Sequence, residues 1–257
     1  MSAPGTRWSR GFGRRWGAEM RLAGLVLALA ALVAMPAAEA QRGRSQGIRS
    51  DGPGRRDWTQ TAMRTPEGFR IGDPDARVKL VEYLSPACAD CVRFAADSDD
   101  ALFRGYVRRG QVSVEYRNVT LNAFDLAATF LARCARPAGY FDMTHYLLAH
   151  QADWMGRANG LSEAQRNELR ALPMFQAVQR LVPMIGLDRI AQRFGLDRNA
   201  QQACLADQAA FDRLTALQQA AQQQNVGAPP AFFVNGERQT GTRWAEIEPS
   251  IRAALGD

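Results

Sequence analysis

The chain has 257 residues, of which 46% are hydrophobic, 23% charged and 9% aromatic. This ordinary globular composition excludes a collagen-like, low-complexity or wholly disordered chain. The net charge of +6 lies in the first 72 residues, which hold 12 basic and five acidic side chains, whereas residues 73–257 hold 20 basic and 21 acidic side chains. Because a polyanion-binding surface needs positive charge on the folded part of a protein, we expect no nucleic-acid partner.

The N-terminal segment has the parts of a secretory signal peptide. Basic residues extend to Arg21, a hydrophobic run covers residues 22–35, and small residues end at Ala40. The 14-residue run is shorter than the ~20 residues of a membrane-spanning helix, although an uncleaved membrane anchor stays open as the alternative. We expect residues 1–40 to be a signal peptide that is cleaved after Ala40.

The next segment, residues 41–67, is rich in Gly, Arg, Ser and Pro and has almost no aliphatic residue. Such a segment cannot bury enough apolar surface to offset its ordering entropy. We expect a flexible linker, and contact of its arginines with anionic lipid headgroups is the alternative.

Strand and helix patterns follow in the order strand, helix, strand. Residues 78–84 form a β-branched and hydrophobic run, residues 88–109 have a helical pattern that is interrupted near residues 97–100, and residues 112–119 alternate between two faces. This order predicts a βαβ unit with two parallel strands.

Residues 121–224 have helical patterns, and we expect about five helices there. A capping box at Ser162 and Gln165 and a glycine stop at Gly195 mark helix ends. A hydrophobic stripe at helical spacing contains Phe124, Ala127, Leu131 and Cys134.

The C-terminal residues predict a β-hairpin and a final helix. A strand over residues 231–234 is followed by Asn235-Gly236, the strongest two-residue hairpin signal, then by a short strand over residues 237–239 and a helix over residues 244–255. The chain is therefore predicted to be an α/β protein whose mixed sheet is split in sequence by a helical insertion.

The chemical motif is Cys88-Ala89-Asp90-Cys91, directly after the first strand of the βαβ unit. A cysteine at a helix N-terminus has a lowered thiol pKa, and this spacing lets the second sulfur close a short disulfide with the first. A zinc site is the alternative, but it needs two further ligands at similar spacing, and we expect no metal. Inert cysteines are the third possibility.

With these motifs, residues 67–257 resemble the DsbA-like periplasmic thiol-disulfide oxidoreductases of the thioredoxin superfamily. The resemblance rests on residues 69–76, 78–84, 85–91 and 230–236. It implies a thioredoxin-like fold with an inserted helical domain. The expected thioredoxin-like domain comprises residues 68–120 and 206–257, and the expected insertion comprises residues 121–205.

The resemblance also implies the roles of the site residues. Cys88 is the expected nucleophile, Cys91 the buried resolving thiol, and Glu82 the carboxyl that moves the proton of Cys91. An exposed strand carboxylate is the alternative for Glu82, since its facing depends on strand register. Pro230 matches the cis-proline that faces the cysteines and shapes the substrate groove.

The chain departs from the family pattern at two positions. Asp90 stands where such oxidases commonly have His, and Ala89 and Asp90 are the residues expected to tune the site. A carboxylate beside a thiolate raises the thiol pKa, so we expect a weaker oxidant than the best-known members of the family. Pro229 precedes the expected cis-proline and has no N–H to offer a bound peptide, so substrate choice is expected to differ.

Cys134 and Cys204 both lie in the insertion. Some relatives look similar here, and in an oxidising compartment the two can form a structural disulfide. Two buried free thiols are the alternative, because four cysteines permit three pairings.

The resemblance implies a periplasmic enzyme without a cofactor that exchanges disulfides with unfolded or folding exported proteins, most simply as a disulfide donor. A membrane quinone-linked thiol oxidase would then reoxidise it. One alternative is a periplasmic reductase or isomerase that a membrane thiol reductase keeps reduced. The other is a non-catalytic thioredoxin-fold module that binds peptides as a chaperone.

Overall fold

The computed structural model describes residues 56–256, so the expected signal peptide and the first part of the expected linker lie outside the described residues. Within residues 56–256, no helix has both the length and the apolar character needed to cross a membrane. The strands are β1 (Ala62–Arg64), β2 (Phe69–Ile71), β3 (Val78–Leu84), β4 (Val112–Asn118), β5 (Ala231–Val234) and β6 (Glu237–Arg238).

Helices before β4, between β4 and β5, and after β5 complete the described part of the chain. The helices before β4 and after β5 are η1 (Trp58–Gln60), α1 (Ala89–Asp99), η2 (Asp100–Val107) and α10 (Trp244–Leu255). The helices between β4 and β5 are α2 (Ala123–Arg133), α3 (Pro137–Ala149), α4 (Gln151–Asn159), α5 (Glu163–Arg170), α6 (Met174–Met184), α7 (Leu187–Arg193), α8 (Arg198–Ala206) and α9 (Gln208–Gln223).

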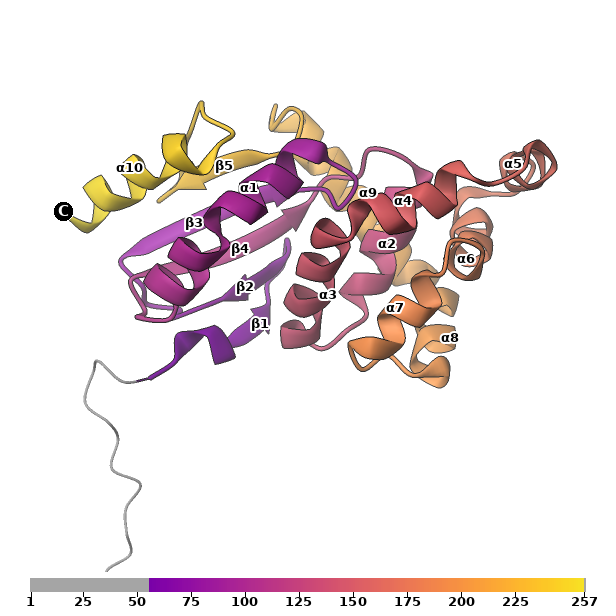
Figure 1. Ribbon diagram of the computed structural model, residues 1–257, viewed down its shortest axis with the longest axis horizontal. Coiled ribbons are helices and arrows are strands. Elements are labelled where there is room, and N and C mark those ends of the chain that lie inside the picture. The colour runs from indigo at the N-terminus through magenta and orange to yellow at the C-terminus, as the bar shows by residue number, and fades with distance from the viewer. Residues whose placement is uncertain (1–55, 257) are drawn as a thin grey trace, which may run out of the picture. The chain divides into compact units, whose positions relative to one another are not determined.

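The strands form one mixed sheet in the order β1-β2-β4-β3-β5-β6 (Figure 1). The two inner strands, β3 and β4, run parallel and are connected through α1 and η2, so the predicted βαβ unit is confirmed. β5 pairs antiparallel with β3, which joins the C-terminal part of the chain to the N-terminal part across the insertion. The α/β fold with a helical insertion is therefore confirmed.

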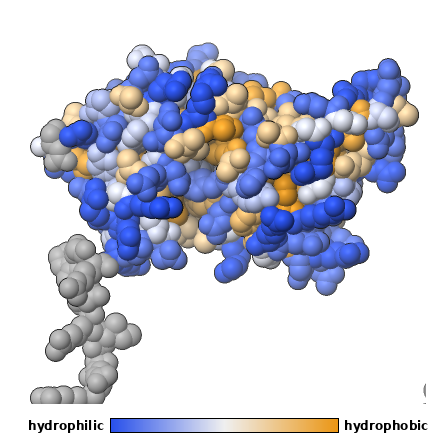
Figure 2. Space-filling model, in the orientation of Figure 1, coloured by the Kyte–Doolittle hydropathy of each residue, from blue (hydrophilic) through white to orange (hydrophobic). Residues whose placement is uncertain are grey.

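The main hydrophobic core lies between one face of the sheet and helices α1, α3 and α10. Side chains of β3 at Leu80 and Leu84 pack there with Phe94 of α1 and Ile247 of α10, and all four are fully buried or nearly so. A smaller cluster on the opposite face joins Tyr83 of β3 to the C-terminal half of α9. The face shown in Figure 2 is mostly hydrophilic, with a hydrophobic patch near its centre, close to α1.

The helix after β3 changes near the predicted place. α1 ends at Asp99, within the predicted range of residues 97–100, and passes directly into the π-helical segment η2. Within η2, Leu102, Phe103 and Val107 are buried in the main core. The polar run therefore changes the winding of the helix rather than ending it.

The hairpin and the final helix form as predicted. Asn235 and Gly236 have φ values of 50° and 88°, both positive, and connect β5 to the antiparallel β6. This is the conformation that a two-residue turn of this type requires. The final helix α10 has the predicted bounds and ends at Gly256, which has a φ of 84°.

The described residues between β4 and β5 form eight helices rather than about five, and the last of them, α9, lies after the expected insertion of residues 121–205. Pro173 directly precedes α6, and Gly186, with a φ of 73°, separates α6 from α7. Each of these residues interrupts a pattern that otherwise reads as one longer helix. The predicted capping box at Ser162 and Gln165 is present at the start of α5.

The expected flexible linker does not extend to residue 67. Asp57 caps η1 through its side chain, and β1 pairs along its length with β2. The Trp58 N–H donates to the carbonyl of Arg108, 3.3 Å away. The expectation was wrong for the described residues from Asp57 onward, because backbone pairing with β2 orders a segment that has almost no aliphatic residue of its own.

Candidate active site

Cys88 is the N-cap residue of α1. The turn between β3 and α1 places its sulfur at the helix end, where Sγ accepts a 3.0 Å hydrogen bond from the Cys91 N–H. Cys88 is 5% exposed, whereas Cys91 is fully buried. Both cysteines are free thiols in this structure. The motif therefore forms at a helix N-terminus, as its place after the strand predicts.

The two thiols have opposite electrostatic environments. Interaction with the Cys91 side chain lowers the pKa of the Cys88 thiol; burial opposes this shift, and the hydrogen bond from the Cys91 N–H and the charge of Arg93 support it. Burial, followed by the interaction with Cys88, raises the pKa of the Cys91 thiol. Cys88 is therefore the thiol that ionises, and it is the more accessible of the two.

Pro229 lies directly against Cys88. The Pro229–Pro230 peptide bond is cis, and both residues are buried. The Cys88 thiol donates a 3.2 Å hydrogen bond to the carbonyl of Pro229. The pairing of β5 with β3 explains this position, because Ala231 lies opposite Tyr83 and the residues before β5 therefore meet the residues after β3.

Glu82 is buried beneath the cysteines and is not an exposed strand carboxylate. Its side chain is 2% exposed and lies on the same face of β3 as Leu80 and Leu84. Its Oε2 atom has no hydrogen-bond partner among the described residues. Burial, with a contribution from the charge of Cys88, raises the pKa of Glu82 to about 8. A carboxyl with this pKa can both hold and release a proton near neutral pH.

A second buried carboxyl, Asp125, was missed in the sequence analysis. It lies in the first turn of α2, where Oδ2 accepts hydrogen bonds from the Ser85 hydroxyl at 2.6 Å and the Leu121 N–H at 2.8 Å. Burial raises its pKa to about 6. Its negative charge raises the pKa of Cys88, against the causes that lower it.

Ser85 shows how Asp125 reaches the active-site loop. The Ser85 Oγ atom accepts a hydrogen bond from the Ala87 N–H at 3.1 Å while donating to Asp125. A second contact between the loop and the insertion is donated by Gln151 Nε2 of α4 to the carbonyl of Pro86 at 2.8 Å. The loop before Cys88 is thus fixed to the helical insertion at two points.

The structure differs from the sequence-based expectation at Asp90. Its carboxylate forms an ion pair with Arg93 one turn later, and both side chains are about half exposed. The surroundings as a whole lower the pKa of Cys88 rather than raise it, with the interaction with Cys91 as the largest cause. The pairing with Arg93 neutralises the charge that was expected to act on the thiolate. Ala89 lies at the exposed first position of α1.

The other two cysteines lie away from this site and are joined to each other. Cys134 at the end of α2 and Cys204 in α8 form a disulfide with a Cα–Cα distance of 5.9 Å. The bond fixes α2 to α8 across 70 residues of sequence. Within the described residues, no three His, Cys, Asp or Glu side chains gather in a group that could hold a metal ion.

Comparison with known proteins gives a family match and several similar structures. The thioredoxin family model matches residues 64–252. The crystal structure of protein-disulfide isomerase from Novosphingobium aromaticivorans is 28% identical, with a TM-score of 0.67 over 73% of this chain and 97% of that chain. The structure of Wolbachia pipientis alpha-DsbA1 is 20% identical, with a TM-score of 0.59 over 76% of this chain and 94% of that chain, and shows the fold alone.

One curated protein with a similar sequence comes from Rickettsia prowazekii. That protein, named as a protein-disulfide oxidoreductase, is 26% identical over 193 residues, which are 73% of this chain and 61% of the relative. Matches to two other Rickettsia proteins of this name cover 36% and 41% of their length. The chain therefore spans less than two thirds of the curated relatives it matches.

Proposed function

The chain belongs to the thioredoxin family, with a DsbA-like fold, and from this we propose that it is a protein thiol-disulfide oxidoreductase that donates disulfides through Cys88 and Cys91. The observation that carries the proposal is the position of Cys88. It caps α1, has a lowered thiol pKa, and donates a hydrogen bond to the carbonyl of Pro229.

The reaction begins with the Cys88–Cys91 disulfide. A substrate thiolate attacks Cys88 Sγ and forms a mixed disulfide, and the electron pair of the broken bond leaves on Cys91 Sγ. Because burial raises the pKa of Cys91, its sulfur takes up a proton. Glu82 is the buried acid that supplies this proton.

The second half of the reaction releases the product. Another substrate thiolate attacks the substrate sulfur of the mixed disulfide, so that a substrate disulfide forms and Cys88 leaves as a thiolate. The environment that lowers the pKa of Cys88 stabilises this leaving group. Two electrons now reside in the Cys88 and Cys91 dithiol, and an oxidant must remove them before the next cycle.

The same lowered pKa supports disulfide donation as the direction of exchange. A low thiol pKa stabilises the reduced enzyme relative to its disulfide, and such a disulfide is a strong oxidant. The expected substrates are unfolded or folding exported proteins in the periplasm, and a membrane quinone-linked thiol oxidase is the expected oxidant. The signal peptide expected in residues 1–40 accounts for export.

An isomerase is the second candidate, because the similar structure at 28% identity is described as a protein-disulfide isomerase. An isomerase needs Cys88 as a thiolate in the reduced enzyme, and the lowered pKa serves that reaction as well. Reshuffling of a substrate with mispaired disulfides by the reduced protein would favour this candidate over donation.

The experiment mixes the oxidised protein with a reduced peptide that contains two cysteines and follows peptide oxidation by mass. We expect stoichiometric oxidation and its loss in both Cys88→Ser and Cys91→Ser, because neither variant can form the Cys88–Cys91 disulfide. When reduced Cys91→Ser is instead given the disulfide form of the peptide, its Cys88 thiolate should attack that disulfide and form a mixed disulfide with Cys88 that accumulates. The variant Cys134→Ala/Cys204→Ala is the matched control and should retain the reaction. Peptide oxidation that survives in Cys88→Ser would overturn the proposal.

A further inference from the structure

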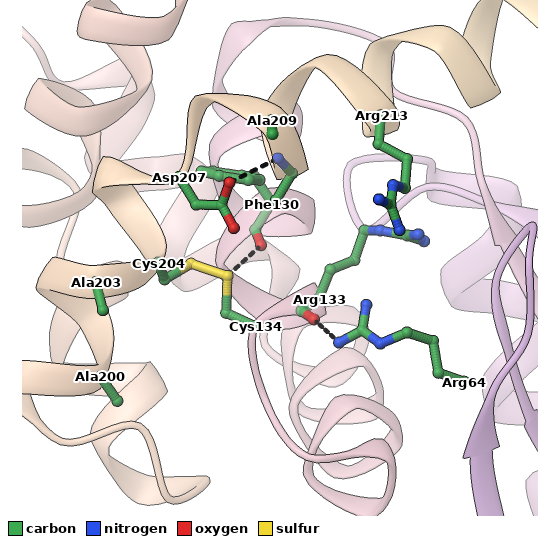
Figure 3. Close-up of a pocket in the computed structure, with 11 residues that line it drawn as sticks. Arg64, Phe130, Arg133, Cys134, Ala200, Ala203, Cys204, Asp207, Ala209 and Arg213 are labelled. Carbon is green, nitrogen blue, oxygen red and sulfur yellow. Dashed lines mark hydrogen bonds between the residues drawn. A yellow bond between two sulfur atoms is a disulfide. The ribbon is translucent and has the colours of Figure 1, made fainter.

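Three arginine side chains line one cavity of about 450 Å³ on the side of the insertion that meets β1. They are Arg64 of β1, Arg133 at the end of α2 and Arg213 of α9. Figure 3 shows their side chains extending toward one another on one side of the cavity, with the Cys134–Cys204 disulfide across from them. Three elements that are distant in sequence therefore bring three positive charges to one place.

Two of the three guanidinium groups are held in position. Arg133 is 8% exposed, and its Nη1 donates to Asn118 Oδ1 at 2.9 Å. The Arg64 Nη2 donates to the carbonyl of Arg133 at 2.8 Å. The Phe69 ring contacts both groups, with its centroid 4.5 Å from the Arg64 guanidinium carbon and 5.2 Å from that of Arg133.

The positive charges have no matching negative charge. Among the described residues, no carboxylate forms an ion pair with Arg64, Arg133 or Arg213. The one carboxylate that lines the cavity among these residues is Asp207, and its Oδ1 atom accepts from the Ala210 N–H and caps α9.

The cluster is electrostatically unfavourable without an anion. Burial lowers the pKa of Arg64, and the charge of Arg213 lowers it further. Burial also lowers the pKa of Arg133, and the charges of Arg64 and Arg213 act in the same direction. Arg133 is the buried member of the cluster, whereas Arg64 and Arg213 are exposed. Since a buried charge is stable only when it is paired, an anion would pair with Arg133, and the two exposed guanidinium groups would add to its attraction.

We propose that this cavity binds a divalent phosphate-type oxyanion, either inorganic phosphate or the phosphate group of a small organic ester. Guanidinium groups match phosphate oxygens with paired N–H donors. A divalent anion offsets more of the three positive charges than a single carboxylate does. The volume is also that of an ordinary small-ligand pocket, which leaves room for an organic group on the phosphate.

The test is isothermal titration of the oxidised protein at constant ionic strength in chloride buffer. The probes are inorganic phosphate, glycerol phosphate and sulfate. We expect saturable binding of phosphate and sulfate, weakened by about tenfold or more in Arg213→Gln, in which one guanidinium is lost. Arg213 is exposed, so this substitution should leave the fold intact. The matched control is Arg252→Gln, an exposed arginine of α10 that does not line the cavity.

The remaining arms identify the ligand form. Phosphate monoesters lose their second proton near pH 6, so the affinity for glycerol phosphate should fall below that pH while sulfate affinity stays constant. Tighter binding of glycerol phosphate than of inorganic phosphate would assign the site to an ester, and equal binding would assign it to the free ion. Absence of saturable binding by all three probes would overturn the proposal, as would equal weakening in Arg213→Gln and Arg252→Gln. Neither result bears on the proposed disulfide exchange at Cys88.

Discussion

The Ser85 hydroxyl donates a 2.6 Å hydrogen bond to Asp125 Oδ2, and both residues are fully buried. The donor lies in the loop that leads to Cys88, and the acceptor lies in the first helix of the insertion. The thioredoxin-like sheet and the insertion therefore meet at the active-site loop. Asp125 adds a negative charge to the environment of the thiol, so the insertion influences the chemistry as well as the shape of the site.

Replacing Asp125 by Asn should make the site more oxidising. The substitution keeps an oxygen for the Ser85 and Leu121 donors but removes the charge that raises the pKa of Cys88. We expect a lower Cys88 pKa, and a several-fold shift of the equilibrium with glutathione toward the reduced protein. A thiolate absorbance titration and glutathione equilibria would measure both.

The pH dependence separates this charge effect from a purely structural one. Because the pKa of Asp125 is about 6, the reactivity of Cys88 in the native protein and in Asp125→Asn should converge below that pH. Asp212→Asn, at an exposed position of α9, is the charge-matched control and should leave the titration unchanged. Equal Cys88 pKa values in the native protein and Asp125→Asn would contradict the role of Asp125.

Alkylation should distinguish the two cysteines of the motif. In the reduced protein, Cys88 has a lowered pKa and some exposure, whereas Cys91 has a raised pKa and none. Iodoacetamide at neutral pH should therefore modify Cys88 selectively, because the thiolate is the reactive form. Peptide mass spectrometry after a short exposure measures the ratio, and preferential labelling of Cys91 would contradict this assignment of nucleophile and resolving thiol.

Glu82 should make the native protein less stable as the pH rises. Its native pKa of about 8 lies above the ordinary value of 4.5, so the native state binds more protons than the unfolded state between these pH values. The stability contributed by the protonated carboxyl is complete below pH 4.5 and is lost as the pH rises to 8. From 1.36 kcal/mol per pKa unit, the loss is at most about 5 kcal/mol.

The Glu82→Gln variant removes this titration while keeping the size of the side chain. Urea unfolding at pH 5 and pH 8 in one reducing buffer should show a smaller loss of unfolding free energy for Glu82→Gln than for the native protein. Glu163→Gln, at an exposed position of α5, is the control and should behave like the native protein. The same pH dependence in all three proteins would show that Glu82 ionises freely.

The Cys134–Cys204 disulfide should stabilise the fold without taking part in the exchange reaction. It closes a loop with a sequence separation of 70, for which chain entropy predicts about 4 kcal/mol. The double variant Cys134→Ala/Cys204→Ala should lose stability of this order in urea unfolding and keep its rate of peptide oxidation. An unchanged free energy of unfolding in the double variant would contradict this stabilising role of the disulfide.

Local sequence signals predicted the sheet around the site. The runs that form β3 and β5 carry enough β-branched and aromatic residues to fix their bounds, and Asn235-Gly236 specifies the hairpin. The position of Cys88 at a helix N-terminus also follows from its place after β3. Its proximity to Pro230 and Glu82 was expected from the family resemblance rather than from any local pattern.

Long-range contacts could not be read in the same way. Ser85 and Asp125 are 40 residues apart in sequence, and Asp125 had the local appearance of an ordinary acidic residue in a first helical turn. Its signal was its place beside the hydrophobic stripe of α2, a helix that is buried almost all round. Likewise, β1 is ordered because it pairs with β2. The composition of residues 41–67 alone carries no information about that pairing.

The most direct test of disulfide donation is the equilibrium between the dithiol and disulfide forms of Cys88 and Cys91 in graded glutathione buffers. Thiol alkylation in a Cys134→Ala/Cys204→Ala background reports this pair alone. The lowered pKa of Cys88 predicts a potential above about −200 mV, in the range of disulfide donors. A potential near thioredoxin's, about −270 mV, would contradict donation, and a pair that forms no disulfide at all would contradict the exchange reaction itself.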